Sequence, residues 1–339
     1  MWTNAVRRFR LRALDAGSLN DHDGAMSGPV STVDAPPTEA EGGHPSPSCV
    51  EVSDSREEQV GQIRVRRALP RKGRRTVGAW CFADHMGPAD VTENSGLDVG
   101  PHPHIGLQTV TWLLDGQALH KDSLGYEQVI KPGQLNLMTS GGAVAHAEEA
   151  TGHYRGTLEG IQLWVALPEE TRHGEAAFEH HAELPQDDLD GGVATVLVGD
   201  FGSLSSPARH DTPLVGVDLD LREATTVPLR PEWEYAVVVL DGEVGIGDRP
   251  LAPGKLGYLG QGRHELRLDV RGRTRAMLLG GEPFPDPIVM WWNFVARDRA
   301  EIDAAYESWA RQDDRFGTVR STLPLIPAKA PFWHRPDGG

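Results

Sequence analysis

The sequence predicts an all-β protein with two β-barrels in tandem, a short C-terminal helix and a disordered N-terminal extension. Three observations predict this fold class. The chain has 339 residues, whereas single hydrophobic cores stop growing at about 250–300 residues. Its 39 glycines and 25 prolines suit many short strands joined by turns. Short β-type runs recur in both halves without helical patterns between them, which favours barrels or sandwiches.

Residues 1–55 are predicted to be a disordered extension. They are rich in Ser, Pro, Gly, Asp and Glu, and such a composition cannot bury enough apolar surface to offset the entropy cost of ordering. Residues 1–14 interleave four arginines with apolar residues, so an interfacial amphipathic helix stays open as the alternative. No long apolar run follows, so we expect no secretory signal, and Met26 is an alternative start.

The first barrel is expected over residues 56–175. An alternating run at residues 62–67 predicts its first strand. Residues 108–114 are rich in β-branched and aromatic side chains, and Asp115-Gly116 then predicts a two-residue hairpin into the next strand. Further strands are predicted at residues 134–138 and 160–166, with a Pro-Gly turn at residues 132–133.

The second barrel is expected over residues 176–290, because its turn signals repeat those of the first. Residues 235–240 form a β-type run that ends in Asp241-Gly242, and Pro253-Gly254 follows. The same order of strand, Asp-Gly and Pro-Gly occurs in the first half, which indicates an internal repeat.

The C-terminal segment, residues 291–339, is predicted to contain a helix and a tail. Asp298 is a suitable N-cap with Glu301 three residues later. Helical spacing places four apolar residues on one stripe, which is typical of a face packed on a core: Ile302, Ala305, Tyr306 and Trp309.

Charge and cysteine content restrict the environment and the partners. A net charge of −16 makes the chain a poor partner for nucleic acid or an anionic membrane. No apolar run approaches the roughly 18 residues that span a bilayer. Two cysteines, Cys49 and Cys81, do not form a disulfide framework, which favours a reducing compartment and hence the cytoplasm.

Two short motifs predict a mononuclear metal site in the first barrel. His102-Pro-His104 places two imidazoles on the same side of a strand, and His146-Ala-Glu148 repeats that spacing with an imidazole and a carboxylate. Either pair alone is usually a surface feature. Both pairs together, separated by the strand and turn pattern of a barrel, predict a shell of three nitrogens and one oxygen.

Imidazole and carboxylate ligands suit iron, manganese, nickel, copper or zinc, whereas calcium and magnesium prefer oxygen ligands. Open positions beside such a set resemble the sites of non-haem iron oxygenases. We therefore expect Fe(II), with another divalent transition metal as the alternative.

The same stretches resemble the pirin family, a branch of the cupin superfamily. The resemblance rests on residues 101–116, on residues 120–125, and on residues 133–141 with the His146-Ala-Glu148 motif after them. Residues 80–88 and 286–294 resemble the opening and C-terminal segments of the family, so the likeness covers about residues 60–320. It implies two cupin barrels of the double-stranded β-helix (jelly-roll) type and one non-haem iron in the N-terminal barrel. Its implied ligands are His102, His104, His146 and Glu148.

Two departures from the general cupin pattern bear on the site. Gln108 stands where the pattern has a glutamate, which leaves Glu148 as the expected sole carboxylate ligand. Gly142 replaces a larger polar residue in the linker before His146. In the second barrel Pro228 and Arg230 align with the two histidines of the first motif, so that barrel is expected to be metal-free.

Other polar residues near these motifs leave alternatives open. Gln162 points into the barrel or is an ordinary strand residue, and Asp84 and His85 brace a turn or support the metal ligands. Residues 64–75 hold seven basic side chains, which indicates a solvated face or an anion-binding patch. His264-Glu265 is expected at the surface or in a structural role.

The resemblance implies two functions. One is a quercetin 2,3-dioxygenase-type oxygenase for a small aromatic, flavonol-like substrate, with Glu148 as the general base. The other is a redox-responsive regulatory protein that binds a transcriptional or metabolic partner, since a change of iron charge inside a barrel can alter nearby loops.

Overall fold

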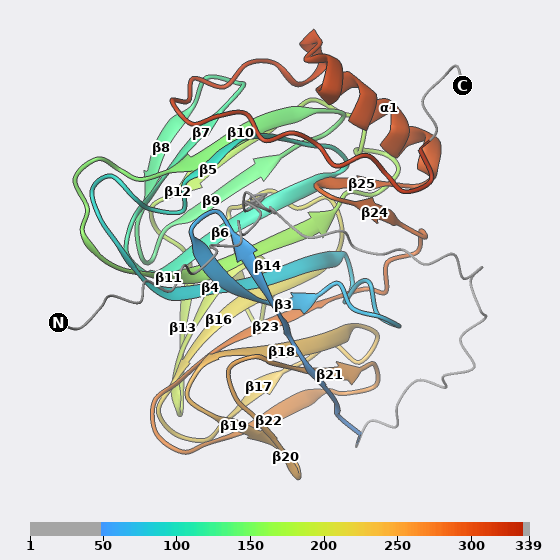
Figure 1. Ribbon diagram of the computed structural model, residues 1–339. Coiled ribbons are helices and arrows are strands. Elements are labelled where there is room, and N and C mark those ends of the chain that lie inside the picture. Colours follow the sequence, from blue (N-terminus) through green and yellow to red (C-terminus); the bar gives the residue numbers. More distant parts are fainter. Residues whose placement is uncertain (1–48, 335–339) are drawn as a thin grey trace, which may run out of the picture.

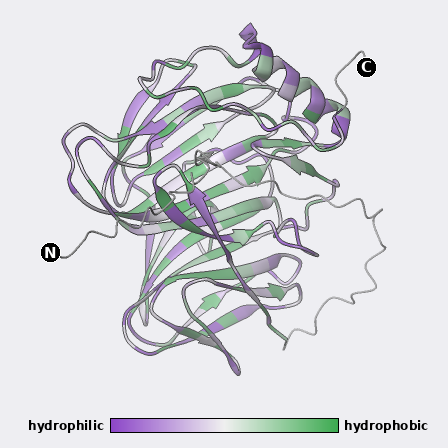
Figure 2. Ribbon diagram, viewed as in Figure 1, coloured by the Kyte–Doolittle hydropathy of each residue, from purple (hydrophilic) through white to green (hydrophobic). Residues whose placement is uncertain are grey.

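The computed structural model describes residues 49–334 as two β-barrels stacked on each other, with a helix beside the first (Figure 1). The predicted all-β class, the two tandem barrels and the C-terminal helix are confirmed. The expectations for residues 1–48, which include disorder, an amphipathic helix and a start at Met26, lie outside the described residues. Figure 2 shows hydrophobic residues along the strands of both barrels and hydrophilic residues gathered on the connecting loops.

Each barrel consists of a larger and a smaller antiparallel sheet. The strands of the first barrel are β2 (Arg56–Val60), β3 (Ile63–Leu69), β4 (Trp80–Val91), β5 (Val99–His104), β6 (Leu107–Asp115), β7 (Ala118–Asp122), β8 (Glu127–Ile130), β9 (Leu135–Thr139), β10 (Val144–Glu149), β11 (Gly156–Ala166) and β12 (Ala177–His181). Its larger sheet has the order β12-β9-β6-β11-β4-β3-β2, and its smaller sheet has the order β5-β10-β7-β8.

The second barrel repeats this arrangement. Its strands are β1 (Glu51–Asp54), β13 (Gln186–Leu189), β14 (Gly192–Phe201), β15 (Leu204–Ser205), β16 (Leu214–Leu221), β17 (Thr225–Pro228), β18 (Glu234–Asp241), β19 (Val244–Ile246), β20 (Arg249–Leu251), β21 (Lys255–Gly260), β22 (Glu265–Val270) and β23 (Thr274–Gly281). The larger sheet has the order β1-β21-β18-β23-β16-β14-β13, with β15 on β14, and the smaller has the order β17-β22-β19-β20. The two barrels therefore correspond strand for strand along both sheets.

Two edge strands lie outside the residue range that was predicted for the barrel to which each belongs. β1 lies within the segment predicted to be disordered, yet it pairs with β21 of the second barrel, from Glu51 opposite Tyr258 to Asp54 opposite Lys255. β12 lies beyond the predicted end of the first barrel but pairs with β9 of that barrel. Both strands have mostly polar sequences and were not predicted for this reason. An edge strand needs little apolar surface, because it is held mainly by backbone pairing to its neighbour.

The hairpin predicted at Asp115-Gly116 is wrong. β6 pairs with β9 and β11, whereas β7 pairs with β10 and β8, so the two-residue connection crosses from the larger sheet to the smaller one. Gly116 has a φ of 90°, and a Cβ there would come within 2.6 Å of the Thr157 carbonyl oxygen. The tight turn was correctly predicted from glycine, but packing of the barrel decides which strands pair.

The two larger sheets pack face to face and join the barrels. Val110 and Leu163 of the first barrel share one buried apolar cluster with Val238 and Met277 of the second. Trp112 belongs to the same cluster, and its Nε1 donates to the Asp218 carboxylate across the interface at 2.8 Å. The barrels are therefore packed through a shared core.

The C-terminal segment covers the outer side of the first barrel. It contains β24 (Val289–Trp291), β25 (Phe294–Ala296), α1 (Arg299–Arg311) and the short 3-10 helix η1 (Asp314–Phe316). Asp298 caps α1 by accepting from the Glu301 backbone N–H at 3.0 Å, as predicted. The apolar stripe of α1 packs in one cluster with Ile105 and Ala145, next to the strands that carry the metal motifs. Within residues 49–334 no helix is long and apolar enough to cross a membrane.

Candidate metal centre

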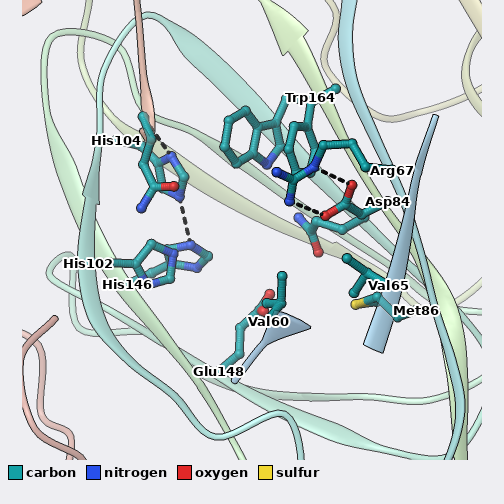
Figure 3. A pocket seen from close by; sticks show the side chains of 13 residues that line it. Val60, Val65, Arg67, Asp84, Met86, His102, His104, His146, Glu148 and Trp164 are labelled. Carbon is teal, nitrogen blue, oxygen red and sulfur yellow. Dashed lines mark hydrogen bonds and ion pairs between the residues drawn. The ribbon is translucent and has the colours of Figure 1, made fainter. Parts of the chain in front are cut away.

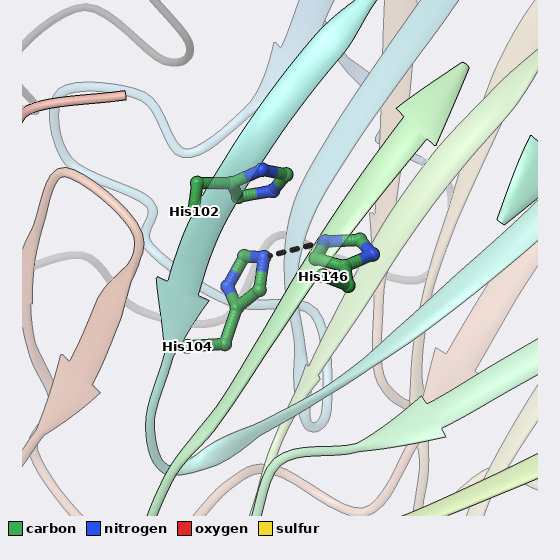
Figure 4. Close-up of side chains that lie close together, drawn as sticks. All are labelled: His102, His104 and His146. Carbon is green, nitrogen blue, oxygen red and sulfur yellow. Dashed lines mark hydrogen bonds between the residues drawn. The ribbon is translucent and has the colours of Figure 1, made fainter. Parts of the chain in front are cut away.

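Three histidines from two adjacent strands meet inside the first barrel. β5 and β10 are antiparallel neighbours, with His102 directly opposite His146. Because alternate residues of a strand share a face, His104 points to the same side as His102. The ligand atoms of the three rings lie within 4.8 Å of one another (Figure 4), and all three side chains are buried.

Backbone hydrogen bonds orient two of these rings. The Nδ1 of His102 bonds the Gly100 carbonyl at 2.9 Å, and the Nδ1 of His104 bonds the Asn293 carbonyl at 3.1 Å. A carbonyl only accepts, so each Nδ1 carries the proton and each Nε2 keeps a free lone pair. A metal-binding histidine is usually held in this way by its other ring nitrogen.

The spacing and protonation of the rings fit a transition-metal ion. Nε2 of His104 lies 3.0 Å from Nε2 of His146, whereas two nitrogens bound at right angles to one ion would be about 2.9 Å apart. Burial lowers the pKa of His102 to about 4, and it also lowers the pKa values of His104 and His146. The rings are therefore neutral, which is the form that binds metals.

Glu148, the predicted fourth ligand, lies apart from the three histidines. It follows His146 on β10, and its side chain lines the same pocket, but it is not part of the group within 4.8 Å. The pairing of β5 with β10 shifts register between these two residues, which changes the local direction of the strand. Burial raises the pKa of the Glu148 carboxyl to about 7.

A second layer of polar groups behind His146 was not predicted. Nδ1 of His120 lies 3.4 Å from Nδ1 of His146, and Nε2 of His120 lies 3.1 Å from Oδ2 of Asp122. Phe178 stacks on the His120 ring with 4.4 Å between centroids. The i, i+2 spacing of His120 and Asp122 on β7 was the available sequence signal, since both face the barrel interior.

The histidines form one end of a pocket with about 430 Å³ of empty space, part of it open to solvent (Figure 3). The pocket is lined by Val60, Val65, Arg67, Phe82, Asp84, Met86, His102, His104, His146, Glu148, Gln162, Trp164 and Asn293. Five apolar or aromatic side chains thus share the lining with the three histidines and five other polar residues, and pockets that combine apolar walls with placed polar groups are typical of small-molecule sites.

Arg67 and Asp84 form a buried ion pair in the pocket wall. Nε and Nη2 of Arg67 donate to the two carboxylate oxygens of Asp84 at 2.8 and 2.7 Å. Burial raises the pKa of the Asp84 carboxyl, and the charge of Arg67 opposes that rise. The structure corrects two interpretations here, because Arg67 is not on a solvated face and Asp84 lies within β4 rather than at a turn.

The predictions for Gln162 and His85 have different outcomes. Gln162 lines the pocket, as one of its two interpretations required, and accepts from the Thr111 hydroxyl at 2.9 Å. His85 does not line the pocket, and its Nε2 lies 3.0 Å from a Glu159 carboxylate oxygen.

The second barrel has an apolar interior at the equivalent strands. β17 and β22 correspond to β5 and β10, and their buried side chains include Val227, Leu266 and Leu268. His264 is exposed. In the described part of the chain, the three histidines of the first barrel are the only cluster of potential metal ligands this close together.

The fold and the site define the chain as a bicupin with a candidate metal centre in its N-terminal barrel. Family models extend this assignment, since the model described as Pirin matches residues 62–165 and the Pirin C-terminal cupin domain matches residues 214–317. The chain belongs to the pirin family.

Individual relatives agree with the family assignment. The chain is 46% identical to the Pseudomonas aeruginosa protein named "Putative quercetin 2,3-dioxygenase PA1205", over 79% of this chain and 88% of the relative. It is 37% identical to a pirin-like protein of Caulobacter vibrioides, over 76% of this chain and 92% of the relative. A crystal structure of quercetin 2,3-dioxygenase from Acinetobacter baumannii superposes with a TM-score of 0.80 at 42% identity, covering 86% of this chain and 97% of that chain.

Proposed function

We propose that the protein is a quercetin 2,3-dioxygenase-type oxygenase that uses Fe(II) and acts on small flavonol-like substrates. The observation that carries this proposal is the convergence of three buried imidazoles at one end of a pocket that also has apolar and aromatic side chains in its wall. The names of the relatives at 46% and 42% identity support the same reaction. When bound, the ion would supply a Lewis acid for a phenolic oxygen and redox chemistry toward dioxygen.

The side chains of the pocket have separate roles in this proposal. His102, His104 and His146 would hold the ion, and their buried position would keep bulk water away from it. Glu148 lines the same pocket and would take the proton of the substrate hydroxyl as general base. Trp164 gives the pocket wall an aromatic surface suited to the flat rings of the substrate, and Phe82 is stacked on Trp164.

The test is a turnover assay with quercetin and dioxygen. Protein loaded with Fe(II) should cause a decrease in flavonol absorbance and a matching uptake of oxygen, at a rate well above that of free Fe(II). Chelation should abolish turnover, and Fe(II) should restore it. A rate no better than that of free iron would contradict the proposal and favour the redox-responsive regulator. The direct test of that alternative is whether the protein retains a protein partner when its iron is in one oxidation state and not in the other.

A further inference from the structure

One nitrogen of a buried guanidinium in the pocket wall has no acceptor. The side chain of Arg67 is 0% exposed, and two of its nitrogens are bonded to Asp84. Its third nitrogen, Nη1, is buried and has no hydrogen-bond partner among the described residues. Figure 3 shows this side chain across the pocket from His104, with the Asp84 pair on the side away from the histidines. Because buried polar groups are nearly always paired, Nη1 is suited to an acceptor on a bound molecule.

The guanidinium is held in a fixed position before any ligand arrives. Two hydrogen bonds to Asp84 set its plane, and its central carbon lies 4.6 Å from the centroid of the Phe82 ring. Phe82 in turn stacks on Trp164, with 4.0 Å between centroids and 13° between planes. A donor fixed from several sides loses little conformational freedom when a ligand binds, which favours both affinity and selectivity.

The chemistry of this nitrogen restricts the ligand atom that it can bind. A guanidinium nitrogen only donates, so the ligand must present an acceptor such as a carbonyl or phenolic oxygen. Asp84 already balances the charge of Arg67, so a neutral oxygen is sufficient and an anion is not required. The surrounding wall of Phe82, Trp164 and Met86 is apolar and suits a flat ring.

We propose that Arg67 is a specificity-determining residue, whose Nη1 binds an oxygen on the far edge of a flat aromatic substrate while the near edge faces the histidines. The inference deepens the proposed function and rests on it for the class of ligand. Arg67 would thus select polyhydroxylated flavonols over flavonols that carry oxygens only on the edge near the histidines.

Ligand binding under argon tests this inference without any turnover. Quercetin and 3-hydroxyflavone are titrated into the protein as purified, and the quenching of tryptophan fluorescence gives the two dissociation constants. The two probes share the 3-hydroxyl and the 4-carbonyl, but only quercetin has hydroxyls on its outer rings. Arg67→Lys keeps a cation beside Asp84 and removes Nη1. Arg66→Lys is the matched control, because Arg66 is the preceding residue and bonds His85 rather than lining the pocket.

The wild-type protein should bind quercetin more tightly than 3-hydroxyflavone. Arg67→Lys should weaken quercetin binding about 10- to 100-fold, as expected for a lost hydrogen bond from a charged donor. It should change the affinity for 3-hydroxyflavone less than about threefold, and Arg66→Lys should match the wild type. If Arg67→Lys does not fold, the double variant Arg67→Gln, Asp84→Asn repeats the test, because it removes the guanidinium without leaving a buried charge unpaired.

Equal affinity of the wild type for both flavonols would overturn the inference, as would an equal loss for both in a folded Arg67 variant. These outcomes are distinct from failure of the proposed function. Selective binding without turnover would contradict only the dioxygenase proposal, whereas turnover with no dependence of binding on Arg67 would contradict only this inference.

Discussion

Nε2 of His104 lies 3.0 Å from Nε2 of His146, although the two residues are 42 positions apart in the sequence. Antiparallel pairing of β5 with β10 brings them together, and His102 completes the cluster from the same strand as His104. The Nδ1 of His104 is bound to the Asn293 carbonyl, so its Nε2 lone pair is directed into the cluster. The strands and the C-terminal segment thus arrange the donors before a metal binds.

Replacing His104 with alanine should remove metal binding and turnover together. The remaining two imidazoles cannot enclose an ion as three can, and we expect metal content to fall at least about tenfold, in line with the cost of disturbing a metal shell. Elemental analysis of protein purified without added metal measures this, with the exposed His264→Ala as the control. Equal metal content in His104→Ala and the wild type would contradict the assignment.

Replacing Glu148 with glutamine should separate metal binding from catalysis. The carboxylate lies outside the histidine cluster, so we expect Glu148→Gln to keep most of its metal. Turnover of quercetin should fall about 10²- to 10⁴-fold, which is the usual contribution of a general base. If the variant instead loses its metal as His104→Ala does, then Glu148 is a ligand, as the sequence predicted.

Replacing Asp84 with alanine should destabilise the fold strongly. The side chains of Arg67 and Asp84 are 0% and 3% exposed, so the substitution leaves a buried cation without its partner. Breaking such a pair costs about 3–5 kcal/mol in the free energy of unfolding. Guanidinium unfolding measures the change. Glu93→Ala removes an exposed partner of Arg155 and should leave the unfolding midpoint nearly unchanged; similar midpoints for the two variants would argue against a structural role for the buried pair.

The two cysteines should differ in reactivity toward a thiol reagent. Cys49 is exposed, whereas Cys81 is buried and its burial raises the thiol pKa to about 12. A thiolate is the reactive form, so the native protein should release one equivalent of chromophore from an aromatic disulfide reagent at pH 8, and two in denaturant. Cys49→Ser should release none in the native state. Fast reaction of Cys81 in that variant would show that β4 opens readily.

The sequence by itself determined the fold class, the repeat and the identity of the three histidines. Alternation along strands, Asp-Gly and Pro-Gly turns, and the capping residue Asp298 are local signals, because each depends on the conformational preferences of a few neighbouring residues. The His102-Pro-His104 spacing is equally local, since the period of a strand alone puts both rings on one side.

Only the tertiary structure decided which segments meet. In the tertiary structure β1 pairs with the second barrel, and the Asp115-Gly116 turn connects the two sheets of the first barrel. Glu148 lies apart from the histidines, beyond a register shift between β5 and β10. The tertiary structure also turned Arg67 inward from a run of basic residues, where Asp84 on the neighbouring strand offsets the cost of burying its charge. These outcomes depend on partners distant in the chain, whose free-energy contributions appear only when the barrels are packed.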